Sequence, residues 1–214
     1  MDRISSLCSR LTKTHFIGIG VTLLLATAIC VGVLVTRRSD SSSTLSPSFQ
    51  HFKEKLAKID HAVQWVKYNS DNVSLTNAFD GGKDGDQTLI YACRANDPYI
   101  SDLLPGTYYP KTKTCKFTYG GKSIERDEFE LLTTKDSSAL IWLENSNGEV
   151  HNGAITAGLT GAKDELYVAR ADINGFYYSI GKIHDIYKLA YVPDGKVEYS
   201  SRDYDVLCLK DFAL

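Results

Sequence analysis

The residue types that could carry out chemistry are scattered along this chain of 214 residues. None of its histidines has metal-ligand spacing to another histidine or to a cysteine; they are His15, His51, His61, His151 and His184. Asp185 follows His184, but the chain has no GxSxG nucleophile elbow to complete a catalytic triad. The sequence therefore predicts neither an enzyme nor a metal site, and it indicates no cofactor.

Two glycine-containing segments could bind phosphate or calcium. Residues 121–123 read GKS, like the end of a phosphate-binding loop, but Lys116 stands where that loop needs glycine, and no helix is expected to follow. Residues 80–86 read DGGKDGD, but Tyr91 occupies the twelfth position, where an EF-hand needs a bidentate glutamate. An ordinary Gly/Asp turn is the favoured interpretation of this loop, and a weak calcium site is the alternative.

Composition narrows the class of protein. The chain has 24 Lys and Arg against 26 Asp and Glu, so no surplus of cations is available to neutralise nucleic-acid phosphates. Its 16 Gly, 5 Pro and 5 Cys exclude collagen-like, disordered and disulfide-dense classes. Thirteen tyrosines with a single methionine favour β structure. We expect a globular β protein that does not bind nucleic acid.

An apolar run follows the N-terminal tail of residues 1–15. Residues 16–35 read FIGIGVTLLLATAICVGVLV, which contains no charge and is long enough to cross a hydrocarbon core of ~30 Å. A signal peptide cleaved near residues 26–28 is one alternative, and a buried core helix is another. A single transmembrane helix is the favoured interpretation.

The charges that flank this run set its expected orientation. Arg3, Arg10 and Lys13 precede it, while Arg37 and Arg38 follow it, so the positive-inside rule favours a cytoplasmic N-terminus by a narrow margin. Asn72 begins an NVS sequon, and glycosylation at this residue would require a lumenal or extracellular location. We expect a single-pass membrane protein whose C-terminal bulk is extracellular or lumenal.

Two short segments connect this anchor to the rest of the chain. Residues 36–50 are rich in Ser, Thr and Pro without apolar periodicity, which predicts a flexible stalk. Apolar residues then recur at steps of three and four, which predicts a short amphipathic helix over 51–62. This helix could pack on the domain or join two stalks into a homodimer.

The remaining sequence repeats itself, at an offset of 74 to 77 residues. Five blocks of the first copy return in the same order in the second: WV as WL, IYACRA as LYVARA, PG as IG, GGK as DGK, and DEFELL as RDYDVL. The copies span residues 63–135 and 140–210. Because they read as short strands joined by turns, we expect an all-β antiparallel fold. A single unit of this length would bury little surface, so the copies should share a core.

These blocks, together with SDLLPG, CKFTYGGK, GAITAG and AYVPDGK, resemble the DM-nine repeat family. This tandem module occurs in invertebrate lectin-like proteins and at the start of natterin-type toxins. The resemblance covers about residues 63–208. It implies two β-sandwich-like units related by a pseudo-twofold, and a lectin that binds mannose-type glycans or microbial surface polysaccharides in innate immune recognition.

The resemblance also implies candidate sugar-binding residues. In such lectins, an acid before the LYVxRA strand and the lysine of the PGK turn bind the sugar. The first copy has Asp80 with Thr107, and the second has Thr160 with Lys182. Asp80 and Lys182 would form one composite site if the copies lie back to back, because a carboxylate accepts hydrogen bonds from sugar hydroxyls and an ammonium donates them.

Other residues complete this set of candidates. Asp102 lies in the SDLLPG loop, and the lysines of the two glycine turns could face a ligand; these are Lys122 and Lys196. Tyr108, Tyr109, Tyr177 and Tyr178 could cover the apolar face of a sugar ring or could pack within strands. The two threonines at lectin positions favour an alternative function, a non-catalytic protein-interaction scaffold with decayed sugar sites.

Three cysteines fall in the repeats. Cys93 and Cys115 belong to the same copy and could form a cross-strand disulfide if the domain is outside the cell. Cys208 lies in the second copy. The alternative is three buried thiols that act as small hydrophobic residues.

The predicted topology can be tested by protease protection of a full-length chain tagged at both ends in membrane vesicles. We expect the C-terminal tag to be protected in microsomes and the N-terminal tag to be digested. Protection of the N-terminal tag with digestion of the C-terminal tag would show the opposite orientation. Loss of both tags from washed membranes would contradict the predicted membrane anchor.

Overall fold

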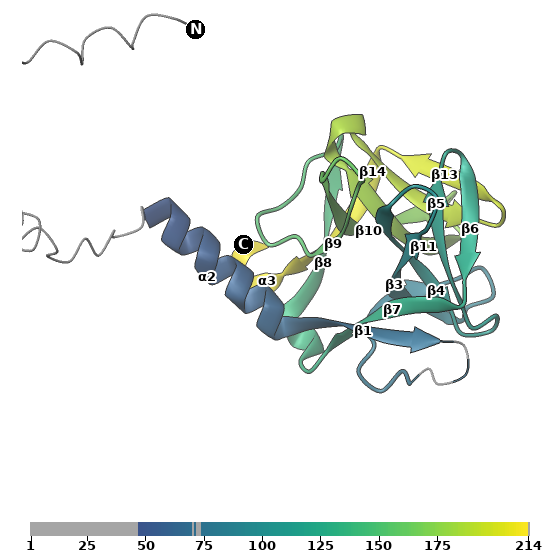
Figure 1. Ribbon diagram of the computed structural model, residues 1–214, viewed down its shortest axis with the longest axis horizontal. Coiled ribbons are helices and arrows are strands. Elements are labelled where there is room, and N and C mark those ends of the chain that lie inside the picture. The colour runs from purple at the N-terminus through teal and green to yellow at the C-terminus, as the bar shows by residue number, and fades with distance from the viewer. Residues whose placement is uncertain (1–46, 70, 72–73, 214) are drawn as a thin grey trace, which may run out of the picture. The chain divides into compact units, whose positions relative to one another are not determined.

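The computed structural model describes residues 47–69, 71 and 74–213 (Figure 1). The predicted tail at 1–15, the predicted membrane span at 16–35 and the sequon asparagine Asn72 lie outside these residues. No helix among the described residues is both long and apolar enough to span a membrane.

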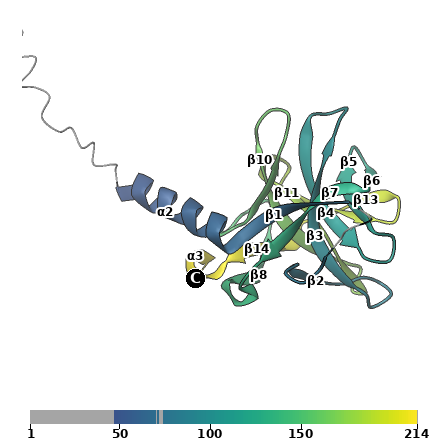
Figure 2. The ribbon, with the colours of Figure 1, turned by 60° about the horizontal axis from the view of Figure 1, so that its bottom comes forward.

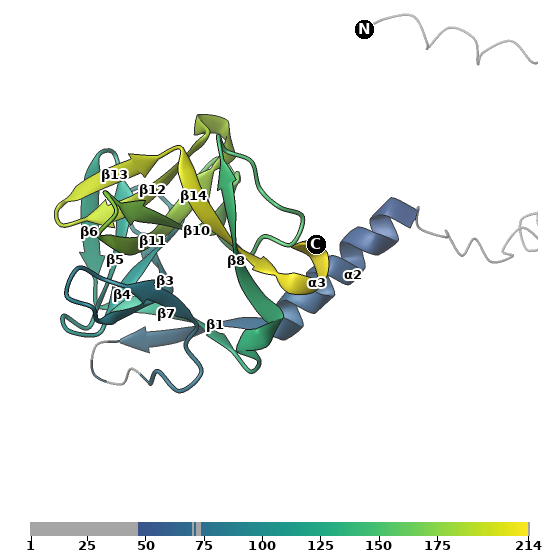
Figure 3. The same ribbon diagram turned by 180° about the vertical axis from the view of Figure 1, so that it is seen from behind.

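Helix α2 (Pro47–Ala62) opens the described part of the chain and continues directly into the first strand (Figure 2). It begins four residues before the predicted start at residue 51, so the end of the predicted stalk is helical. A proline at the first helical position is favourable, because its missing N–H would be unpaired there in any case. Among the helix side chains that the structure describes, Ile59 is buried in the core and Ala62 packs against it. The short C-terminal helix α3 (Lys210–Ala213) lies beside α2, where the Phe212 ring is 4.9 Å from Lys58 Nζ (Figure 3).

The rest of the described chain is built from strands, as predicted, with two single-turn 3-10 helices. The first-half strands are β1 (Val63–Asn69), β2 (Asp80–Lys83), β3 (Leu89–Asp97), β4 (Asp102–Tyr109), β5 (Thr114–Tyr119), β6 (Lys122–Arg126) and β7 (Glu128–Thr134). The second-half elements are η1 (Ser137–Ala139), β8 (Leu140–Ser146), β9 (Thr156–Leu159), β10 (Glu165–Ile173), β11 (Tyr177–His184), η2 (Asp185–Tyr187), β12 (Leu189–Asp194), β13 (Val197–Ser201) and β14 (Asp203–Leu209).

The strands correspond one to one between the two halves. Their order is β1-β7-β3-β4-β5-β6-β13-β12-β11-β10-β14-β8, so the same succession is met from either end. The halves join edge to edge where Lys122 of β6 pairs with Val197 of β13. Strands β3 and β10 have the same length and the same alternation of buried and exposed residues, as do β7 and β14. The tryptophans also correspond: Trp65 pairs with Leu132, and Trp142 pairs with Leu207.

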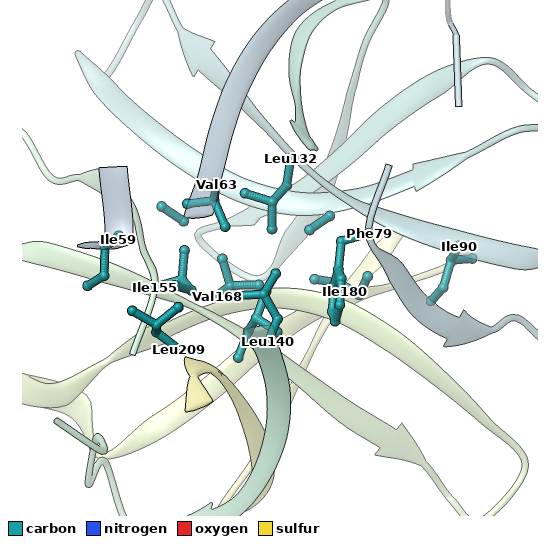
Figure 4. Close-up of a cluster of buried hydrophobic side chains, with 13 residues drawn as sticks. Ile59, Val63, Phe79, Ile90, Leu132, Leu140, Ile155, Val168, Ile180 and Leu209 are labelled. Carbon is teal, nitrogen blue, oxygen red and sulfur yellow. The ribbon is translucent and has the colours of Figure 1, made fainter. Parts of the chain in front are cut away.

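The largest of the apolar clusters among the described residues draws on both halves (Figure 4). Phe79, Ile90 and Leu132 of the first half meet Ile155, Val168, Ile180 and Leu207 of the second half in it. The backbones also come close, because a Cβ at Gly158 of β9 would collide with the carbonyl oxygen of Leu103 in β4. Neither half could keep these side chains away from water without the other.

Two arginines reinforce this junction with reciprocal contacts. Arg94 donates from Nε to Glu130 within its own half, at 2.6 Å, and from Nη1 to the carbonyl of Ala157 in the other half, at 3.3 Å. Its counterpart Arg170 donates to Asp205, at 2.8 Å, and to the carbonyl of Gly81 across the junction, at 3.3 Å. Each guanidinium also lies over a tryptophan ring, at 4.4 Å in the first half and 4.7 Å in the second.

A disulfide in the first half joins Cys93 of β3 to Cys115 of β5 across the intervening strand β4, with the Cα atoms 6.0 Å apart. Gly106 of β4 lies opposite Cys93, in a place where a Cβ would collide with the Lys116 carbonyl. The corresponding positions of the second half hold Ala169 and Ala190. The cross-link is therefore specific to one half.

Replacing both bridged cysteines, as in Cys93→Ala/Cys115→Ala, should lower the free energy of unfolding by about 3 kcal/mol, because the bridge closes a loop with a sequence separation of 22. Urea denaturation of the oxidised protein and of the double variant measures this difference. Equal midpoints for the two proteins would contradict the prediction.

Candidate functional site

A cavity of about 530 Å³ lies where the two halves meet. The first half contributes Asp102, Leu104, Tyr119 and Gly120 to its lining. The second half contributes Thr160, Gly161, Ala162, Asp164, Leu166, Lys182, His184, Tyr187, Tyr191 and Glu198. The lining therefore combines carboxylates, a buried amine, a histidine and tyrosines, which can together bind a ligand that carries several polar groups and an apolar face.

Lys182 of β11 is buried, and its ammonium is held by the protein itself. Nζ donates to both the carbonyl and the hydroxyl oxygen of Thr118, the latter at 3.1 Å, and lies 3.7 Å from a carboxylate oxygen of Glu198. Burial disfavours the charged form and lowers the pKa of Lys182 from 10.5 to about 8, although Glu198 partly opposes this shift. The ammonium thus donates to two oxygens of Thr118 and is ion-paired with Glu198 before any ligand arrives.

Three carboxylates line the cavity together with this lysine. Asp102 accepts a hydrogen bond from the backbone N–H of Gly161, at 2.6 Å, and so ties a first-half strand to the second-half loop. Asp164 accepts one from the Thr160 hydroxyl at 3.1 Å. Glu198 accepts one from the backbone N–H of Gly121, at 3.3 Å. The side chain of Asp164 is the most open of the ion-paired carboxylates here, at 37% exposed against 13% for Glu198.

The aromatic part of the cavity lies around the end of β11. The ring of His184 meets the ring of Tyr187 edge to face, with centroids 4.7 Å apart. Tyr187 is 61% exposed and Tyr119 is 44% exposed, so both present ring surface to solvent at the mouth of the cavity. Such rings can cover the apolar face of a sugar.

The structure brings some of the sequence-predicted residues together and separates others. Lys182 and Asp102 line the same cavity, whereas Asp80 does not line it. The exposed Asp80 accepts a hydrogen bond from the backbone N–H of Gly82, at 2.7 Å. Lys122 and Lys196 lie on adjacent turns, where the Lys196 carbonyl accepts from the N–H of Ser123, and neither lines the cavity. The composite site of Asp80 with Lys182 is therefore not the cavity that Lys182 lines.

Comparison with known proteins identifies the family of the chain. The model of the DM9 repeat matches residues 84–201, which is more than half of the chain and includes every residue that lines the cavity. The chain belongs to the DM9 repeat family. The family resemblance predicted from the sequence is thus confirmed.

Two individual proteins are similar to this DM9 chain. Natterin-4 of Thalassophryne nattereri is 28% identical over 151 residues, which are 68% of this chain and 33% of Natterin-4. The nematode sperm cell motility protein MFP2B has a similar solved structure, with a TM-score of 0.53 at 13% identity, over 68% of this chain and 46% of that one. The DM9 chain therefore spans about a third of the curated relative, and the structural likeness shows a shared fold alone.

Strand matching between the DM9 halves changes one pairing that the sequence suggested. Thr160 forms the same turn as Asp84: the Thr160 N–H donates to the carbonyl of Asp164, and the Asp84 N–H donates to the carbonyl of Thr88. Asp84, rather than Asp80, is therefore the first-half counterpart of Thr160. Sequence reasoning missed Asp164, which places a carboxylate four residues after that threonine and at the cavity. The Thr-x-x-x-Asp spacing of this turn is the signal that could have indicated it.

The residue pairing that the sequence suggested for the glycine turns of the two DM9 halves is also off by one residue. Gly120 and Gly195 occupy the same turn position, with φ of 58° and 59°, a region that favours glycine. The counterpart of Lys196 is therefore Gly121, and the counterpart of Lys122 is Val197. The two turn lysines are not equivalent residues.

The first half of the DM9 chain fills the place that corresponds to the cavity. Thr107 is the counterpart of Lys182, and its hydroxyl exchanges hydrogen bonds with the backbone of Ile180, at 2.7 and 2.8 Å. Tyr109 is the counterpart of His184, and its hydroxyl lies 3.5 Å from that of Ser179. Burial raises the pKa of Tyr109, whose partly buried ring packs against the shared apolar cluster.

The depressed pKa of Lys182 predicts a rise of stability with pH. The unfolded chain, with a lysine pKa near 10.5, binds more protons than the folded chain above the folded pKa of about 8, so the free energy of unfolding should increase as pH rises through this window. Relative to Lys182→Met, the native protein should gain about 1 kcal/mol per pH unit between pH 8 and 9.5, as measured by urea denaturation. Lys196→Met, on an exposed turn, is the control and should follow the native slope. Parallel curves for native protein and Lys182→Met would contradict the prediction.

Proposed function

We propose that this DM9 chain is a non-enzymatic carbohydrate-binding protein that takes a mannose-type glycan into the cavity around Asp164 and Lys182. The observation that carries the proposal is the cavity itself, where carboxylates, a histidine and exposed tyrosine rings from both halves face a common space. Its volume suits a pyranose ring.

Each component has a defined role in this proposal. A carboxylate accepts hydrogen bonds from neighbouring sugar hydroxyls, and charge-assisted bonds of this kind are the stronger ones. Asp164 is open enough to do so, with its side chain 37% exposed. Tyr119 or Tyr187 would cover the apolar face of the ring. Lys182 stabilises the wall of the cavity rather than contacting the sugar, because its ammonium is already paired with Thr118 and Glu198.

We further propose that a single-pass anchor at residues 16–35 presents the DM9 domain outside the cell or in a lumen, for innate immune recognition of glycans. The apolar run supports an anchor. The Cys93–Cys115 disulfide supports the location, because disulfides persist in oxidising compartments. The strand-by-strand match of the halves supports a duplicated unit related by a pseudo-twofold.

A second candidate function is a protein-interaction scaffold, as a monomer or a homodimer. Tyr109 fills the first-half counterpart of the cavity, which favours the loss of one ancestral site. Tyr99 and Phe176 are 90% and 79% exposed, and exposed aromatic residues are common at protein interfaces. This function predicts self-association by crosslinking and no retention on a glycan array.

Calorimetric titration of the full-length chain in detergent with methyl α-mannoside tests the carbohydrate proposal. Asp164→Asn should weaken binding about tenfold or more, because one charged acceptor is lost. Asp60→Asn removes the same charge from exposed helix α2 and should leave binding unchanged, as should Asp80→Asn. No heat of binding with the native chain, and no retention on mannan resin, would refute carbohydrate binding of this type. An effect of Asp80→Asn equal to that of Asp164→Asn would instead support the composite site of Asp80 and Lys182 that the sequence suggested.

A further inference from the structure

The histidine at the end of strand β11 has an unused polar atom. His184 is 9% exposed, and its Nε2 has no hydrogen-bond partner among the residues that the structure describes. A buried polar atom without a partner costs free energy, and His184 is one of the residues that line the cavity, so a ligand atom in the cavity could supply the missing partner.

The surroundings of Nε2 define what that ligand must offer. The Asp164 carboxylate oxygen lies 3.7 Å away, too far for a direct hydrogen bond. An oxygen atom about 2.8 Å from each could reach both, accepting from Nε2–H and donating to the carboxylate. The Tyr187 ring closes one side of this space with its edge contact to the imidazole.

We propose that His184 Nε2 hydrogen-bonds one hydroxyl of the bound sugar and selects among sugars by the position of that hydroxyl; this rests on the carbohydrate-binding function proposed above. His184 is then the specificity-determining residue of the cavity, and Asp164 is its partner on the same hydroxyl.

The charges in the cavity favour a hydroxyl over an acidic group. Asp102, Asp164 and Glu198 contribute three carboxylates, and the ammonium of Lys182 is already engaged with Thr118 and Glu198. A ligand carboxylate would add a further negative charge beside them. A hydroxyl carries no charge and can both accept from the imidazole and donate to Asp164.

A thermodynamic cycle tests this assignment. Methyl α-mannoside and its 2-, 3-, 4- and 6-deoxy derivatives are titrated into the native chain, His184→Phe and the control His151→Phe, whose imidazole contacts the Glu144 carbonyl and does not line the cavity. One deoxy derivative should bind the native chain about tenfold more weakly than the parent sugar. In His184→Phe the parent should bind more weakly than it binds the native chain, and the difference between the parent and that derivative should shrink to the part that Asp164 contributes. His151→Phe should behave as the native chain does.

Two further measurements keep the test decisive if His184→Phe does not fold. His184→Gln retains a hydrogen-bonding group and should preserve part of the discrimination. In native protein with ¹⁵N-labelled histidine, the His184 Nε2 resonance should shift with the parent sugar and not with the critical derivative.

The outcomes separate the two proposals. A native chain that binds none of the five sugars refutes the mannose-type function and the His184 assignment with it. A native chain that binds them, with the same pattern of deoxy effects in the His184 variants and no shift of Nε2, refutes the His184 assignment alone.

Discussion

The structure depends on one constraint, which is that neither half of the chain can cover its own inner apolar face. Ile90 and Leu132 of the first half are kept from water by Val168 and Ile180 of the second, within one shared cluster. Burial of apolar surface is not directional, whereas the hydrogen bonds of Arg94 and Arg170 to the backbone of the opposite half are. These bonds therefore help to fix how the halves are placed against each other. The halves must therefore fold against each other, in a fixed register.

The candidate site is a product of the same constraint. Asp102 reaches from the first half to the N–H of Gly161 in the second, and Lys182 reaches back to Thr118 of the first. The walls of the cavity thus come from residues far apart in sequence, and their spacing is set by the packing of the shared core. The hydrogen bond of Asp102 to Gly161 thus ties the loop that carries Asp164 to a strand of the other half.

Much of this fold could be predicted from the sequence, because period-two strands and recurring blocks are local signals. IYACRA and LYVARA fall on the matching strands β3 and β10. The site was harder to predict. The approach of Asp164 to His184 joins a turn to the end of another strand, and no local pattern reports that contact. Asp80 lies four residues from Asp84, the true counterpart of Thr160, and a shift of this size in a loop is enough to select the wrong acid.

The filled counterpart of the cavity has a consequence for binding strength. Thr107 and Tyr109 occupy the first-half position, so under the function proposed above the chain would take one sugar, in the second-half cavity, and would be monovalent. Weak single contacts with a polysaccharide become strong only when many copies are arrayed and engage neighbouring units together. Avidity would then be set by the surface density of the protein, and a sparse display would release what a dense display retains.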